Sequence, residues 1–195
     1  LLSELLGKIE MRELLDPEVV AQFEREVQRL DPERRVRGDE GVADLLRLLG
    51  PLTVAEIAAR LESEDASAGE QAGAVTEDET TDAESTDAEM PAFPHAAASV
   101  DALVTARRAI TVPMAGETRI AAIEDAGRLR DALGAPLPVG IPLAFLEPAA
   151  DPLAELVARY ARTHAPFTAG EVAARFGIGV AVARHALCLL YTSPS

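Results

Sequence analysis

Tryptophan is absent from this 195-residue chain, and only 4% of its residues are aromatic, so aromatic side chains cannot form the bulk of a core. Alanine and leucine dominate the apolar residues, whose share of 48% is enough for a buried core in one or two domains. Small and aliphatic side chains with high helix propensity favour packed helices over an all-β fold. We therefore expect a mainly α-helical protein.

The residues that most enzyme sites need are also scarce. The single cysteine, Cys188, cannot make an internal disulfide and agrees with a reducing compartment. The only lysine stands in Gly7-Lys8-Ile9, which does not match a phosphate-binding loop. His95, His164 and His185 lack the spacing of a zinc site, and no serine has the surroundings of a nucleophile elbow. We predict no catalytic, cofactor-binding or metal-binding residue in this chain.

No apolar stretch approaches the roughly 18 residues that a membrane span needs, and no secretory signal is recognisable. The sequence thus predicts a cytoplasmic protein without a membrane partner. The chain opens at Leu1, and helical spacing of apolar residues begins at once, so we expect the true N-terminus to lie elsewhere. Residues 188–195 depart from the Ala-rich helical pattern that reaches about Leu187, and we expect them to be a non-native tail.

Charge is distributed unevenly along the chain. The net charge is −15, and the segment from Glu62 to Glu89 holds 11 acidic residues and no basic one. The remainder is close to charge balance, which is compatible with nucleic-acid binding but lacks a strongly basic signature. Few large apolar side chains stand between 63 and 98, so little burial would offset the entropy of ordering. We expect 63–98 to be a disordered insertion; an acidic segment that mimics nucleic acid is the alternative.

Helical spacing and capping residues predict an ordered series of helices, with an Arg-rich turn that includes Arg34 after the second. Two strands, 110–114 and 118–123, are expected to form a hairpin through Ala115-Gly116-Glu117. Four prolines between 135 and 148 exclude a long helix there. That segment is expected to be an ordered connection packed by Leu137, Ile141, Phe145 and Leu146. The predicted helices are 2–14, 16–30, 42–49, 53–61, 100–108, 125–133, 151–163, 168–176 and one from 180.

An internal repeat organises these elements. Residues 51–61 and 166–176 are identical at six of eleven positions, and each copy pairs a capping threonine with a glutamate three residues later. In the second copy a three-residue turn leads into the next helix, which is the helix-turn-helix arrangement. In the first copy the acidic insertion would separate the second helix from the third, and the hairpin would be the wing.

The predicted fold is mainly α with a small β-hairpin: tandem winged-helix-like modules, the second truncated. Residues 1–38 would form a helical lead-in, 39–133 the first module with its insertion, 134–150 the proline-rich connection, and 151–187 the second module. Arginine serves phosphates and guanine edges. The candidate nucleic-acid contacts are Arg107 and Arg108 after the third helix, Arg119 on the wing, and Arg184 with His185 on the last helix.

Several segments resemble the large helicase-related (Lhr) family of bacterial superfamily 2 helicases over roughly residues 8–187. They are 13–17, 28–35, 41–52, 106–110, 122–131 and 151–164. The resemblance implies a region that follows the helicase core, at the start of a C-terminal extension with tandem winged-helix modules. It also implies ATP-driven 3′-5′ unwinding of DNA or RNA:DNA hybrids in DNA repair. ATP and Mg²⁺ would bind in the parent helicase core, since this segment carries none of the family's ATP-binding motifs.

Three functions therefore stand open. The first is an accessory nucleic-acid-binding and scaffolding region, whose partners are DNA or an RNA:DNA hybrid and the rest of the parent helicase chain. The second is a stand-alone winged-helix transcription regulator. The third is a scaffold for glycosylase-like chemistry in a C-terminal part that this sequence does not include.

Overall fold

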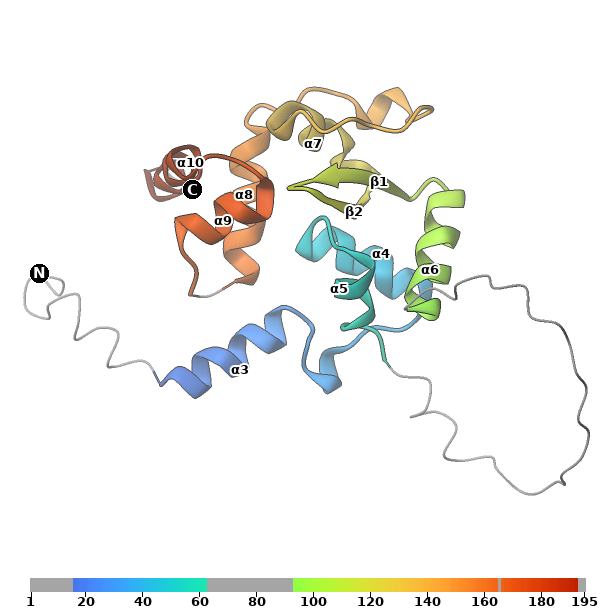
Figure 1. Cartoon of the computed structure of the whole chain (residues 1–195), viewed down its shortest axis with the longest axis horizontal. Coiled ribbons are helices and arrows are strands. Elements are labelled where there is room, and N and C mark those ends of the chain that lie inside the picture. Colours follow the sequence, from blue (N-terminus) through green and yellow to red (C-terminus); the bar gives the residue numbers. More distant parts are fainter. Residues whose placement is uncertain (1–15, 63–92, 165, 193–195) are drawn as a thin grey trace, which may run out of the picture.

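The computed structural model describes residues 16–62, 93–164 and 166–192 (Figure 1). The predicted helix 2–14 and the insertion up to residue 92 lie outside the described residues. The helices are α3 (Pro17–Val27), α4 (Gly38–Leu49), α5 (Val54–Ala58), α6 (Pro94–Thr105), α7 (Ala126–Leu133), α8 (Pro152–Thr163), α9 (Ala169–Phe176) and α10 (Val180–Thr192). Strands β1 (Ala109–Met114) and β2 (Glu117–Ala122) and short 3-10 turns η1 (Pro32–Arg34), η4 (Ile123–Asp125) and η5 (Leu143–Phe145) complete the described elements.

The first module has the winged-helix order of elements. Helices α4, α5 and α6 enclose one core, and β1 pairs with β2 in an antiparallel hairpin. Between α4 and α5, at the place of the first strand of a winged helix, Leu52 forms an isolated antiparallel bridge to β2: its N–H donates to the Ile120 carbonyl at 2.9 Å, and its C=O accepts from the Ile120 N–H at 2.7 Å. Helix, strand, helix, helix and hairpin follow one another, with the acidic segment between α5 and α6. The predicted mainly α fold with a small hairpin is confirmed.

Several predicted helix boundaries are wrong: α4 begins at Gly38 instead of Val42, and the largest differences are at α6 and α10. Helix α6 begins at Pro94 rather than near residue 100, so the last residues of the expected insertion belong to the fold. The reason is burial: Ala96 is 2% exposed and packs in the first core with Val100. At the other end, α10 does not stop near Leu187 but continues to Thr192, and Leu187 and Leu190 pack against the second core.

The hairpin has an apolar face toward each module. Ile110, Val112 and Met114 of β1 belong to the core shared with α7, α8, α9 and α10. Ala109, together with Ile120 and Ala122 of β2, belongs to the core of α4, α5 and α6. Successive strand residues point to opposite faces, so the hairpin contributes to both cores and lies between the two helix groups (Figure 1). On the face toward the first module only the base is covered, because Thr111, Pro113 and Thr118 are exposed. The wing thus joins the two modules through its buried residues.

The proline-rich connection closes over α7. Leu137, Ile141, Phe145 and Leu146 pack against the second core, as expected from the sequence. The chain passes so near α7 that a Cβ at Gly127 would lie 3.0 Å from the Glu147 carbonyl oxygen. Only glycine permits this approach without displacing the backbone.

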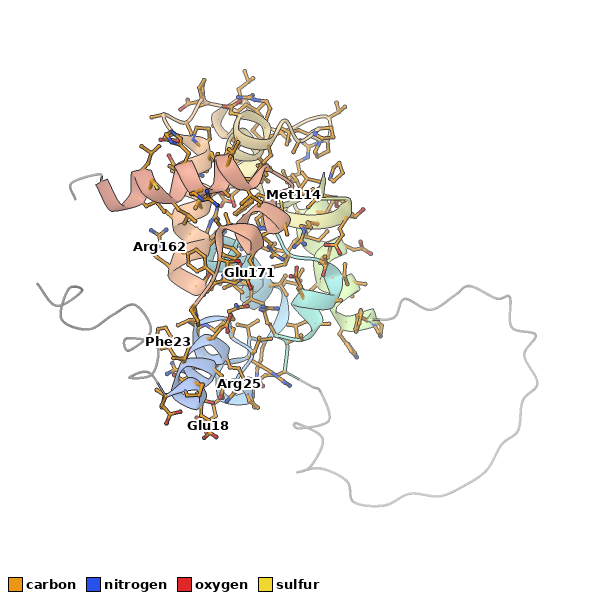
Figure 2. The ribbon with its side chains drawn as sticks, turned by 60° about the vertical axis from the view of Figure 1, so that its left-hand side comes forward. Glu18, Phe23, Arg25, Met114, Arg162 and Glu171 are labelled. Carbon is orange, nitrogen blue, oxygen red and sulfur yellow. The ribbon has the colours of Figure 1, made fainter. Side chains whose placement is uncertain are left out.

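Helix α3 precedes the first module and buries none of its own residues. Val19 and Phe23 are exposed on it, and Figure 2 shows Phe23 and Arg25 on this helix at the edge of the described structure. Its C-terminal end is fixed by Arg60 of the segment that follows α5. The Arg60 guanidinium donates to the main-chain oxygen and to the side-chain Oε1 of Gln28, both at 2.8 Å.

A candidate nucleic-acid interface

The predicted contact residues do not form one surface. Arg107 and Arg108 follow α6, whereas Arg184 and His185 are exposed on α10, across the hairpin (Figure 1). Arg108 is half-buried and donates to Glu40 of α4 at 2.7 Å. No described element brings the two pairs together.

The prediction that Arg119 contacts nucleic acid from the wing is wrong, because this arginine is buried. Its residue is 6% exposed, and its guanidinium donates to Glu56 at 3.0 Å and to Glu117 at 2.6 Å. An arginine buried in this way between two carboxylates has its charge already neutralised. It lies between the modules and is not presented to a nucleic acid.

The third helix of each module carries little positive charge. Helix α6 contains no arginine or lysine, and its one charged residue is Asp101. Helix α10 contains Arg184 as its single arginine, while Val180 and Val182 are exposed beside it. Cations that neutralise phosphates supply most nonspecific affinity for nucleic acids. These two helices are therefore poorly equipped to bind a duplex in the usual winged-helix manner.

Two ionic clusters hold the modules together. In the first, Asp125 is 3% exposed and accepts two bonds from Arg159 of α8, at 2.7 and 2.8 Å. Arg159 also donates to the Arg47 carbonyl oxygen at the end of α4, at 3.2 Å. Such a bidentate pair is strong and has a defined geometry, so α8 is fixed against both α4 and η4.

The second cluster centres on Glu56 of α5. One carboxylate oxygen accepts from the Thr53 N–H at 2.8 Å and from Arg119, and the other accepts from Arg175 of α9. Burial raises the pKa of Glu56, but the hydrogen bonds from Arg175 and Thr53 and the nearby arginine charges outweigh it, so the pKa lies below its ordinary value. The carboxylate stays ionised and links the first repeat to the second.

The arginines that sequence reasoning did not select gather in a groove between α3, η1, α4 and α8. This cavity of about 460 Å³, here called the seam groove, contains a single acidic residue and five arginines. A smaller cavity of about 330 Å³ adjoins it along α8 and shares Arg47, Arg159 and Arg162 with it. Figure 2 shows Arg162 projecting from α8. The seam groove is lined by Glu26, Val27, Arg29, Arg34, Arg47, Leu48, Arg159, Arg162 and Thr163.

The five arginines fall into two kinds. Arg47 and Arg159 are held by carboxylates, Arg47 by Asp44 at 3.2 Å and Arg159 by Asp125. Within residues 16–62, 93–164 and 166–192, the guanidinium groups of Arg29, Arg34 and Arg162 have no recorded hydrogen bond or ion pair. No carboxylate of the described residues pairs directly with these three groups, although Asp31 lies close enough to Arg34 to feel its charge. Three guanidinium groups around one cavity form a site for oxyanions.

Arg29 also has an unusual backbone. It follows the end of α3 with φ 59°, and the N–H of Leu30 bonds back to the Arg25 carbonyl at 2.8 Å. This left-handed position at a helix end is normally taken by glycine. A non-glycine residue there costs about 1 kcal/mol, so the chain keeps a guanidinium at the groove against its backbone preference.

Neither a metal centre nor a membrane span is evident in the part of the chain that the structure describes. No group of three or more His, Cys, Asp or Glu residues is placed to hold a metal ion there. No single described helix is long and apolar enough to cross a membrane; α9 and α10 pass that test only as a pair, bent by 114°.

Comparison with known proteins gives consistent matches. The family described as the winged-helix domain of the large helicase-related protein matches residues 13–82 and 70–148. A protein of Mycolicibacterium smegmatis named Lhr helicase/probable uracil glycosylase is 49% identical over 187 residues, which is 96% of this chain and 10% of that protein. The Escherichia coli Lhr helicase/uracil glycosylase is 37% identical over 187 residues, again 96% of this chain and 10% of that protein. The chain thus spans about a tenth of the length of these relatives.

Proposed function

The chain belongs to the large helicase-related (Lhr) family, in its winged-helix region, and from this premise we propose that it is an accessory nucleic-acid-binding and scaffolding region of an ATP-dependent helicase. In this proposal the parent enzyme moves 3′ to 5′ along a strand and unwinds DNA or RNA:DNA hybrids during DNA repair in the cytoplasm. ATP and Mg²⁺ would act in the helicase core, outside this chain.

The observation that carries the nucleic-acid role is the seam groove. The chain as a whole is strongly acidic, yet five arginines and one carboxylate converge there. A local positive site on an acidic protein attracts a polyanion only at that site, because charges beyond about 10 Å are largely screened at physiological salt. The groove therefore gives the polyanion a defined place to bind.

The scaffolding role rests on the shared hairpin. It contributes buried residues to the core of each module, and Glu56 and Asp125 add ionic links across the same junction. A unit joined in this way transmits the position of one neighbour to the next with little internal motion.

The proposal is tested by fluorescence anisotropy with the 195-residue chain. Labelled single-stranded DNA, duplex DNA and RNA:DNA hybrid are titrated at low and at moderate salt. We expect micromolar binding to at least one of them that weakens as salt rises, since phosphate contacts release counterions. If the folded chain binds none of them, the nucleic-acid role is wrong and only scaffolding is left.

The two other functions differ in support. Both relatives are named as uracil glycosylases as well as helicases, the Mycolicibacterium smegmatis protein as a probable one, so a scaffold that positions a glycosylase segment elsewhere in the parent chain is a second candidate. The transcription-regulator alternative has less support, because α6 contains no arginine or lysine and the one arginine of the wing, Arg119, is buried between carboxylates. A glycosylase assay on the parent protein, with and without the substitution Asp125→Ala at the junction, tests the second candidate.

A further inference from the structure

We propose that the seam groove binds the phosphates of one nucleic-acid strand, without reading its bases, and that Arg29, Arg34 and Arg162 are the residues that hold them. This inference rests on the proposed nucleic-acid function and assigns it a site away from the third helices of both modules. It predicts binding that tolerates sequence and prefers a single strand to a duplex.

The charges favour phosphate as the ligand. Guanidinium groups match phosphate oxygens geometrically and stay charged at any physiological pH. Arg47 and Arg159 are already engaged with carboxylates, so their charges are largely neutralised and they line the groove without being the groups that hold the ligand. The guanidinium groups of Arg29, Arg34 and Arg162 make no hydrogen bond or ion pair within the described residues, and they come from the segment after α3, from η1 and from α8. A phosphate between them would receive hydrogen bonds from more than one side.

The shape favours one strand over two. The cavity of about 460 Å³ falls in the range of roughly 300–1,000 Å³ that holds small ligands. A duplex is normally bound by a convex element that enters its major groove, about 12 Å wide. A concave site between helices instead admits the backbone of a flexible single strand, one or two phosphates at a time.

The lining explains why bases would not be read. Its uncharged members are Val27, Leu48 and Thr163, and no aromatic side chain is among them. Proteins that hold bases in single strands do so largely by stacking them on aromatic rings. The seam groove can therefore grip the backbone but has no platform for a base.

The left-handed backbone of Arg29 allows its side chain to be removed without destabilising the fold. Arg29 and Arg107 are both non-glycine residues with left-handed φ, 59° and 56°, each directly after a helix. Glycine relieves the strain at either position, so Arg29→Gly and Arg107→Gly should both leave the fold at least as stable as before. The first removes a guanidinium from the groove, and the second removes one from the end of α6.

The experiment measures the affinity of the 195-residue chain for a labelled thymidine single strand, a mixed-sequence single strand and a duplex. Two matched pairs are compared: Arg29→Gly with Arg107→Gly, and Arg162→Ala with Arg184→Ala on α10. We expect the groove variants to weaken single-strand binding by at least about 10-fold each, as loss of a charged hydrogen bond does. The two controls should bind as the unsubstituted chain does, and a urea titration should show no lower midpoint for either glycine variant.

The outcomes separate this inference from the proposed function. Weaker binding by Arg107→Gly and Arg184→Ala, with unchanged groove variants, would move the site to the third helices and leave the proposed function standing. Tighter binding to duplex than to single strands, or a strong preference between the two single-strand sequences, would also overturn the inference. If the unsubstituted chain binds no oligonucleotide, the proposed function fails and this inference fails with it.

Discussion

Replacing Glu56 with alanine measures how strongly the two modules depend on each other. Glu56 completes the capping box of α5 with Thr53 and also neutralises Arg119 of the hairpin and Arg175 of the second module. Its counterpart in the repeat, Glu171, completes the same capping box with Thr168. Glu171 is exposed and forms no ion pair with an arginine of the described residues. The pair Glu56→Ala and Glu171→Ala therefore differs in the contacts between modules.

The expected loss in the free energy of unfolding follows from these contacts. Loss of the capping interaction costs about 0.5–1 kcal/mol at either position. At position 56 the substitution also leaves buried Arg119 with one carboxylate instead of two, and leaves Arg175 with the Pro51 carbonyl alone. Removing one partner of a buried ion pair costs about 3–5 kcal/mol. Because the Glu56 side chain is 30% exposed, we expect a smaller additional loss, about 2 kcal/mol.

Urea unfolding monitored by circular dichroism gives the two free energies of unfolding. We expect Glu56→Ala to lose about 2 kcal/mol more than Glu171→Ala, in a single transition, since the hairpin belongs to both cores. Equal losses at the two positions would refute the reasoning. The contacts with Arg119 and Arg175 would then contribute nothing measurable to the junction.

Two further predictions concern the second module. Gly177 and Gly134 have nearly the same left-handed backbone, φ 65° and 64°, but a Cβ at 177 would lie 3.1 Å from the Ala115 Cα, whereas nothing lies within 4 Å at 134. By thermal or urea unfolding, Gly177→Ala should cost about 1–2 kcal/mol more than Gly134→Ala; equal costs would mean that the hairpin tip is not packed there. Burial, then the nearby arginines, lower the pKa of His164 despite its bond to the Tyr160 carbonyl. The unfolded chain then takes up the proton more readily, so stability is complete above pH about 6.5 and falls as the pH drops below it. In the variant His164→Phe, the urea midpoint should depend less on pH in this range. If the midpoint falls as steeply with falling pH as in the unsubstituted chain, the dependence does not come from His164.

Features set by neighbouring residues could be predicted from the sequence. Both capping boxes form as expected, Thr53 with Glu56 and Thr168 with Glu171. The hairpin was also predicted, although its turn is tighter than expected. Met114 pairs with Glu117 across the two turn residues Ala115 and Gly116, whose φ values are 54° and 82°. Two residues with positive φ match the twist of a hairpin better than a longer loop does.

Features set by packing between distant segments could not be predicted. The burial of Arg119 depends on Glu56, which is 63 residues away in the chain, so the arginine looked like a surface residue on a wing. The seam groove requires α8 to pack on the end of α4, where Arg159 meets the Arg47 carbonyl across 112 residues. Arg34 was visible as part of an Arg-rich turn, but no local pattern linked it to Arg162. The site became apparent only in the folded structure.

The salt dependence of single-strand binding tests the central claim most directly. The 195-residue chain and the triple variant Arg29→Gly, Arg34→Ala, Arg162→Ala are titrated with the same labelled single strand over a series of salt concentrations. Each phosphate contact contributes about 0.7 to the slope of log affinity against log salt. If all three arginines hold phosphates, the slope should become shallower by about 2 in the variant. Equal slopes for the two proteins would show that the seam groove is not where the strand binds.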